Sequence, residues 1–339
     1  MSNLSLEISI VLFIISAVVI VVSGTRIAEI ADRLAQKTKL GQALMGALFL
    51  GFSTSLPGIV TSISAALGNH PVLALSNALG DIAVQTAFLG IADITYLEAN
   101  LEYAAASVET LTQGSLLIVL LTIPLLATAY PLINIWGIHP ASIGLVITYI
   151  FGLRLVAVAH SSPMWKAQDT EKFETSIEET DSSGTVKLWG YFLILAVILA
   201  IAGYGVEKAG ISITRSTHLS ENAVGSLFTA ISTSLPELVT TIAAVQRRAF
   251  TLAVSGVLGG NSFDVLVLAL CDLAYHKGSI YHALTEHQVF LLALTILMTG
   301  ILLLGLLRRE KHGIGNIGFE SFLLLLLYLG GFLLVFFSG

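Results

Sequence analysis

Charged residues are scarce in this chain. Asp, Glu, Lys and Arg make up 11% of its 339 residues, whereas hydrophobic residues make up 55%. A soluble globular protein carries about twice that share of charge, because polar side chains have to cover its surface. The composition therefore excludes an ordinary soluble domain and predicts an integral membrane protein in contact with the lipid bilayer. We expect no nucleic-acid partner.

Several patterns typical of enzymes are also missing. The single cysteine, Cys271, excludes an internal disulfide and a cysteine cluster. The eight histidines form no H-E-x-x-H pair, and no G-x-S-x-G or phosphate-binding P-loop pattern is present. We therefore expect no catalytic residue, no cofactor-binding residue and no organic cofactor. An intramembrane aspartyl protease is the one enzymatic alternative, because Asp81 and Asp264 fall in apolar runs. The glycine-aspartate signature that flanks the aspartates of such enzymes is incomplete here.

Apolar runs recur along the whole chain, most of them near the length of about 20 residues that crosses a bilayer core. We place ten membrane spans at residues 8–23, 43–67, 72–95, 114–132, 138–159, 188–210, 223–245, 250–273, 288–307 and 316–337. The first run lacks a small-residue cleavage site and is followed by Arg26, so it is interpreted as a retained span. The sequence thus predicts an all-α, multi-pass membrane protein with ten transmembrane helices.

Basic residues lie mostly on one side of these spans. Connections after odd-numbered spans hold twelve Lys and Arg and the other connections hold three, with Arg154 left inside a span. Cytoplasmic loops carry the excess of positive charge, so the odd connections should be cytoplasmic and both termini outside. The predicted location is the cell (inner) membrane.

Residues 161–187 form the only long polar stretch. A solvated cytoplasmic linker is our interpretation; a regulatory ion site is the alternative, but the acidic residues lack the spacing of a calcium loop. The linker separates a first unit, 1–160, from a second, 188–339, with five spans in each. An odd number of spans makes the second unit enter the membrane from the opposite side. We therefore predict two inverted five-helix repeats related by an axis in the membrane plane.

An internal repeat supports this division. The pentapeptide S-T-S-L-P occurs at 53–57 and again 179 residues later at 232–236, and further matches follow at the same offset without a gap. The duplicated segments cover about 43–95 and 222–274. The repeat also pairs Asp93 with Asp272 near span ends, where caps or solvated ends are favoured over mouths of an ion pathway.

The repeated pentapeptides carry hard oxygen ligands in the middle of their spans. Proline cannot donate to the helix ladder, so the carbonyls four residues before Pro57 and Pro236 lose their usual partner. Such carbonyls, together with hydroxyls, suit sodium, calcium or magnesium. A structural kink with hydroxyls bonded back to the backbone is the alternative. The candidate ligands are Ser53, Thr54, Ser55, Ser232, Thr233 and Ser234.

Two carboxylates accompany the second copy. Glu237 directly follows Pro236, and Asp264 lies in the next span. The two spans form an antiparallel hairpin that turns near residues 247–249, which places residues 237 and 260 at one depth and Asp264 one helical turn further on. Glu237 and Asp264 can therefore converge on a metal ion. A protonated pair held for structure is the competing interpretation.

The chain at this point resembles the calcium:cation antiporter superfamily, the sodium/calcium exchanger group in particular. That family carries G-T-S-L-P-E and G-S-N-x-x-[ND] in each of two repeats. The second repeat here reads S-T-S-L-P-E at 232–237 and G-G-N-S-F-D at 259–264, and the first reads S-T-S-L-P-G at 53–58 and G-D-I-A-V-Q at 80–85. The resemblance implies a central site, alternately open to each side, that exchanges sodium or another cation for calcium.

The first repeat departs from the family pattern at three positions. Gly58 stands where the family has a glutamate ligand, Gln85 where it has asparagine or aspartate, and Asp81 where serine is usual. Residues 58 and 81 are equally far from the turn at 69–70, so they should face each other. We interpret the change as relocation of an acid across the helix pair, which leaves three acids in the site: Asp81, Glu237 and Asp264.

The leading hypothesis is a secondary active antiporter that exchanges sodium for calcium or another divalent cation. A proton-coupled cation antiporter of the same fold, with the carboxylates as proton acceptors, is the second hypothesis. A non-transporting membrane sensor or an intramembrane protease is the third. The expected partners are inorganic cations and lipid, and the expected oligomeric state is a monomer.

Overall fold

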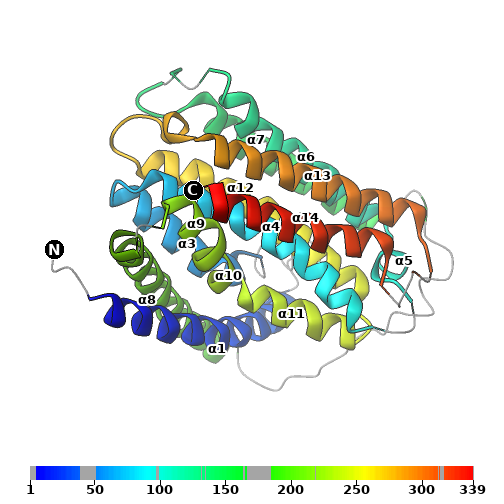
Figure 1. Cartoon of the computed structure of the whole chain (residues 1–339). Coiled ribbons are helices and arrows are strands. Elements are labelled where there is room, and N and C mark those ends of the chain that lie inside the picture. Colours follow the sequence, from blue (N-terminus) through cyan, green and yellow to red (C-terminus); the bar gives the residue numbers. More distant parts are fainter. Residues whose placement is uncertain are drawn as a thin grey trace.

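Helices make up nearly all of the regular structure in the computed structural model of this chain (Figure 1). It describes residues 5–38, 51–96, 99–130, 132–133, 135–162, 165, 185–217, 219–311, 313 and 317–338. The helices are α1 Leu6–Thr38, α3 Gly51–Leu67, α4 Pro71–Ile94, α5 Leu101–Ala104, α6 Val108–Ala127, α7 Pro140–Ser161, α8 Thr185–Thr217, α9 Glu221–Ala223, η3 Val224–Thr229, α10 Ala230–Thr233, α11 Leu235–Gln246, α12 Phe250–Ala274, η4 Ile280–Ala283, α13 Glu286–Arg308 and α14 Phe319–Ser338. No strand occurs within these ranges, so the all-α prediction is confirmed.

Eight helices of the described part are long and apolar enough to cross a membrane, and the bent segment 221–246 raises the number to nine. These helices coincide with nine of the ten predicted spans. The other predicted span, 43–67, begins outside the described residues, and its second part is α3. The predicted linker, 161–187, also falls largely outside them.

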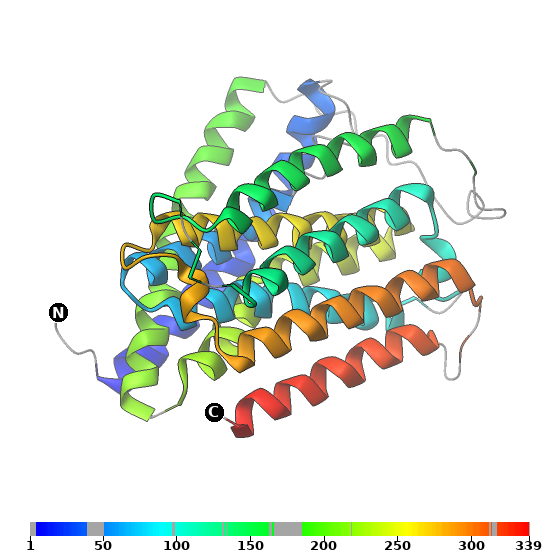
Figure 2. The ribbon, with the colours of Figure 1, turned by 90° about the horizontal axis from the view of Figure 1, so that it is seen from above.

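Helices α4 and α12 form the centre of the bundle, and the other long helices surround them (Figures 1 and 2). In the most apolar stretch of α4, 94% of the residues are buried, against 22% in α1 and 28% in α8 and α14. The outer helices turn large apolar side chains away from the bundle, for example Ile14, Val18, Leu193 and Val197. An apolar exterior of this kind is suited to lipid.

The helix boundaries repeat at the offset found in the sequence. Helices α1 and α8 both have 33 residues and begin 179 residues apart, at positions 6 and 185. The same offset separates the first residues of α4 and α12, at 71 and 250, and of α7 and α14, at 140 and 319. The repeat in the fold therefore extends beyond the duplicated pentapeptide to most of each half.

The two hairpin turns have the same backbone conformation. Asn69, after α3, has φ 63°, and Arg248, after α11, has φ 62°. The next residue donates a backbone hydrogen bond back into its helix in each case, from His70 to Ala65 and from Ala249 to Ala244, both at 2.9 Å. A left-handed residue closed in this way is a common helix C-terminus. The predicted turns at 69–70 and 247–249 are thus confirmed.

Helices α1 and α8 pack on each other as a separate pair. They form their own apolar cluster, which includes Ile20, Ile27, Leu34, Leu188, Leu199 and Val206. Each helix of the pair meets the main bundle at a glycine. A Cβ atom on Gly24 would lie 2.3 Å from Pro236, and one on Gly203 would lie 2.6 Å from the carbonyl of Pro57. These close approaches hold the pair against both segments that carry the repeated S-T-S-L-P pentapeptide.

The connections gather at two ends of the bundle. Helix α1 begins, α3 turns into α4, and α14 ends at one end, on the left in Figure 1. The turn between α11 and α12 lies at the other end. We call these ends the His70 face and the Arg247 face, after a residue of each hairpin turn.

Buried aspartates tie the two halves together. Each accepts one backbone N–H bond from the connection that follows its own helix and one from the other half, and the partners are again 179 residues apart. Asp93 accepts from Leu101 at 2.6 Å and from Gly318 at 2.8 Å. Asp272 accepts from Ile280 at 2.8 Å and from His139 at 2.7 Å. Both aspartates are buried structural acceptors, which agrees with their interpretation as caps.

Glu102, beside Asp93, provides a test of this junction. Burial, and then the charge of Asp93, raise the pKa of the Glu102 carboxyl to about 7. Ser321 donates to Oε1 at 2.5 Å, while Oε2 has no partner. A raised pKa means that the fold favours the protonated form. The stability contributed is therefore present below the ordinary pKa of 4.5 and is lost as the pH rises through about 7.

We predict that Glu102→Gln stabilises the protein at pH 8 by about 2–3 kcal/mol and has little effect at pH 4.5, because the amide stays neutral at both values. Thermal unfolding in detergent at the two pH values measures the difference. Glu286→Gln is the control, because Glu286 is exposed in the first turn of α13 and should show no such gain. Equal effects of Glu102→Gln at pH 4.5 and pH 8 would contradict the prediction.

Candidate cation-binding site

The two proline segments differ in their backbone. In the second repeat, α10 ends at Thr233, α11 begins at Leu235, and the axis bends by 45° at the break. The π-helix η3 directly precedes α10, and such wider turns disturb the regular helix ladder. In the first repeat, α3 continues through Pro57 without interruption. The sequence predicts a carbonyl without its usual helical partner in both copies; an interruption of the helix itself is present only in the second.

Asp81 lies at the centre of the polar network. It is 4% exposed and lies on α4, the most deeply buried of the long helices. Thr233 and Ser234 donate to Oδ1 at 2.8 and 2.9 Å, and the Asn77 amide donates to Oδ2 at 3.0 Å. Both hydroxyls belong to the bent segment of the second repeat, so the predicted ligands of the two halves do come together at Asp81.

Gly58 leaves the space that Asp81 fills. A Cβ atom at position 58 would lie 2.6 Å from Asp81 Oδ2, which is closer than real Cβ atoms approach another heavy atom. In the second repeat the equivalent residues are Glu237 and Gly260, so an acid and a glycine stand at exchanged positions. The predicted face-to-face placement of residues 58 and 81 is therefore present.

Gln85 and Asp264 contact each other across the centre of the bundle. The Gln85 amide donates to Asp264 Oδ2 at 2.8 Å, and it lies 3.4 Å from Ser234 Oγ. The two residues are 179 positions apart and therefore occupy the same place in the two repeats. Equivalent residues can touch in this way only where the halves meet, so this contact marks the centre of the molecule.

Glu237 lies at the inner end of a cavity of about 170 Å³. Glu237 is 6% exposed, and neither of its carboxylate oxygens makes a well-formed hydrogen bond. Asp264 is close enough for the two charges to interact, as predicted from the hairpin. Thr54 and Ser55 lie beside Glu237, and the buried Ser55 hydroxyl is also close enough to interact with Asp264. Oxygens with this much unused capacity are suited to a cation.

The outer serines of the two pentapeptides are placed differently. Ser53 is fully buried in α3. The Ser232 hydroxyl donates to the carbonyl of Phe228 at 2.8 Å, which is the back-bonding expected of a structural kink. The Ser232 side chain is therefore bonded within its own helix, whereas the hydroxyls of Thr233 and Ser234 donate to Asp81.

Some polar residues at the centre were not identified from the sequence. Asn77 bridges Asp81 and Ser62 and accepts from the Thr229 hydroxyl at 2.5 Å. Asn261 donates to the Thr86 hydroxyl at 2.9 Å. Asn77 lies one helical turn before Asp81, and that spacing was the signal available in the sequence.

The arrangement offers three carboxylates, several hydroxyls and amide oxygens in a buried, central position. Among the described residues, no three Asp, Glu, His or Cys side chains lie together closely enough to hold a metal ion by themselves. A bound cation would therefore need hydroxyl or amide oxygens as well as the acids, which is the mixed ligand set that calcium and sodium accept.

Comparison with known proteins agrees with this geometry. The family described as sodium/calcium exchanger protein matches residues 8–158 and again 187–337. The inner membrane protein YrbG of Escherichia coli is 24% identical over 259 residues, covering 76% of this chain and 77% of that protein. The membrane protein MJ0091 of Methanocaldococcus jannaschii is 24% identical over 271 residues, covering 79% and 80%.

Solved structures of the sodium-calcium exchanger NCX_Mj have the same fold. The form soaked with Na+ and Sr2+ superposes with a TM-score of 0.59 at 22% identity and covers 96% of this chain and 97% of that chain. Members of this family are transporters, so no enzymatic activity is assigned. Because the family matches most of each half, the chain belongs to the sodium/calcium exchanger family, within the calcium:cation antiporter superfamily.

Proposed function

We propose that this protein exchanges sodium for calcium or another divalent cation by alternating access at the central site. The observation that carries the proposal is the contact between Gln85 and Asp264, equivalent residues of the two repeats, beside the unpartnered carboxylate of Glu237. A site at the junction of two inverted repeats can be exposed to either side by opposite movements of the repeats, which is how alternating access works.

The acids have separate roles in this proposal. Glu237 faces the cavity and is the first buried carboxylate that an ion meets. Asp81 and Asp264 hold the deeper position, and hydroxyls and the Gln85 amide keep them oriented when no cation is bound. A cation entering the site replaces these hydrogen bonds with oxygen ligands. Its charge also relieves the repulsion among the three acids.

We further propose ten transmembrane helices arranged as two inverted repeats of five. The support is the constant offset of 179 in helix starts, hairpin turns, glycine–proline contacts and aspartate ties. The excess of Lys and Arg after odd-numbered spans supports placing the Arg247 face in the cytoplasm of a cell membrane and the His70 face outside.

Flux into proteoliposomes tests the proposed exchange. We predict that external calcium is taken up only when the lumen holds a second cation, with sodium the strongest driver. Uptake should collapse when sodium is equal on both sides, because antiport needs a counter-gradient. Isotope uptake with sodium, potassium or a pH gradient imposed in turn measures this.

Two outcomes would change the assignment. Uptake driven by a pH gradient and indifferent to sodium would identify the proton-coupled antiporter. Calcium entry at the same rate without any counter-ion gradient or membrane potential, above the leak of protein-free liposomes, would refute exchange altogether.

A further inference from the structure

The cavity at Glu237 leads to only one of the two faces. Its wall runs from Glu237 and Thr54 to Arg247 and Ala249, at the α11–α12 turn. Helix α1 forms one side of it with Thr25, Ala28 and Glu29. The central site therefore communicates with the Arg247 face in this structure.

The repeat identifies a second route to the opposite face. Adding or subtracting 179 converts the wall of the cavity into positions on α3, α4, α8, α10 and the α3–α4 turn. On α8, these positions are Tyr204, Glu207 and Lys208, which correspond to Thr25, Ala28 and Glu29 in that order. The second route therefore leads to the His70 face, and it carries residues that the first route does not have.

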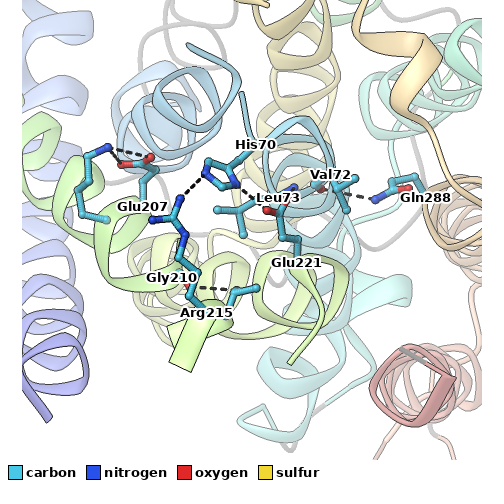
Figure 3. A network of polar contacts seen from close by, with 10 residues as sticks. His70, Val72, Leu73, Glu207, Gly210, Arg215, Glu221 and Gln288 are labelled. Atoms are coloured by element: carbon cyan, nitrogen blue, oxygen red, sulfur yellow. Dashed lines mark hydrogen bonds and ion pairs between the residues drawn. The ribbon is translucent and has the colours of Figure 1, made fainter. Parts of the chain in front are cut away.

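The second route is closed at Glu207. This side chain has 0% exposure. A Cβ atom on Gly68 would lie 3.6 Å from Glu207 Oε1, so the carboxylate packs against the α3–α4 turn (Figure 3). In the open route, the corresponding residue is Ala28, which carries no charge.

Lys208 forms an ion pair with the Glu207 carboxylate. Its Nζ atom lies 3.1 Å from one oxygen of Glu207 and 3.3 Å from the other, and 4.9 Å from the centre of the Tyr204 ring. A carboxylate beside an aromatic face is a favourable place for a cation. The ammonium group of the neighbouring residue fills that place.

Further charges join the end of α8 to the main bundle. Arg215 lies 3.4 Å from His70 Nε2, and His70 Nδ1 lies 2.5 Å from Glu221 (Figure 3). His70 is also close enough to interact electrostatically with Glu207. These contacts lie on the His70 face, so the outer end of the closed route is charged and ordered.

We propose that Glu207 and Lys208 form a cation gate between the His70 face and the central site. Lys208 is a tethered cation, and an ion entering from this face has to displace it from Glu207. The proposal rests on the proposed exchange function and adds a second ion-binding position to it. A divalent ion competes better than a monovalent one for a single carboxylate, because its attraction to that charge is twice as large. The gate therefore contributes selectivity at one face only.

Transport measured separately from each face of the membrane tests the gate. Lys208→Gln should lower the half-saturating calcium concentration at the His70 face by about three- to tenfold, the size of a partly buried ion pair. The value at the Arg247 face should stay unchanged. Right-side-out and inverted membrane vesicles give the two values separately, since each exposes one face to the added calcium.

Related variants separate the gate from simpler effects. Lys208→Arg keeps the charge and should behave like the unmodified protein. Lys277→Gln removes one exposed charge from a loop on the same face and controls for surface potential. Glu207→Gln should weaken calcium binding at the His70 face. Adding Lys208→Gln to Glu207→Gln should have no further effect, because the carboxylate for which the ammonium and calcium compete is already absent.

The outcomes distinguish this proposal from the exchange function. If exchange is measurable and Lys208→Gln leaves the His70-face value unchanged, or shifts both faces equally, the gate is refuted while exchange stands. An equal shift from Lys277→Gln would also refute it, in favour of surface charge. Absence of any exchange in the unmodified protein would overturn the proposed function itself.

Discussion

Glu237→Gln is expected to abolish divalent-cation transport. The substitution keeps the shape of the side chain and removes a full charge from the inner end of the cavity, where both carboxylate oxygens are unpartnered. No second glutamate can take over, because the equivalent position of the first repeat is Gly58. Losing a charged ligand of a divalent ion costs about 3 kcal/mol, so flux should fall by roughly a hundredfold or more.

A matched variant in the same cavity separates this effect from general damage. Glu29 also lines the cavity but is 46% exposed and forms an ion pair with Arg26. Glu29→Gln should therefore reduce flux by no more than about twofold, because exposed charges contribute little. Gel filtration in detergent checks that both variants fold. Unchanged flux in Glu237→Gln would remove this residue from the central site.

The constant offset made much of the fold predictable. The turns at 69–70 and 247–249, the meeting of residues 58 and 81 and the proximity of Glu237 to Asp264 all follow from counting residues away from a hairpin turn. Such counting works where two apolar helices are joined by a short turn, because the turn fixes their register.

Features outside the S-T-S-L-P pentapeptides and their carboxylates were harder to predict. Helix α1 continues to Thr38, well past the predicted span end at residue 23, because polar residues can extend a helix beyond the bilayer core. The π-helix before α10 has no simple sequence signal. Asn77 looked like an ordinary polar residue, and its role appears only when Thr229 and Ser62 are brought beside it from other helices.

The charged network of α8 was missed for a different reason. Glu207 and Lys208 are adjacent in sequence, and adjacent residues on a helix do not normally face each other. Their contact depends on the α3–α4 turn, which encloses the Glu207 carboxylate. The repeat could have drawn attention to them, because it aligns this charged pair with Ala28 and Glu29 on α1.

The exchanged positions of glycine and acid lead to the final prediction, a set of three variants. Asp81→Ala should be nearly as damaging as Glu237→Gln, because it removes the acceptor of three hydrogen bonds as well as a candidate ligand. Gly58→Glu alone should also abolish transport. Its Cβ atom would lie 2.6 Å from Asp81 Oδ2, and its carboxylate would bring a fourth negative charge into a buried site.

Combining Gly58→Glu with Asp81→Ser should recover part of the divalent-cation affinity. Serine removes the carboxylate that obstructs position 58, and the new glutamate then supplies an acid from α3 instead of α4. The double variant should bind calcium at least about tenfold more tightly than Gly58→Glu or Asp81→Ser alone, a gain of about 1.4 kcal/mol in binding free energy. Calorimetry in detergent and flux in vesicles measure binding and transport separately. If Asp81→Ala transports normally, the acid at 81 has not replaced the one missing at 58. The site would then rest on two carboxylates, and exchange of monovalent ions or protons would be the better assignment.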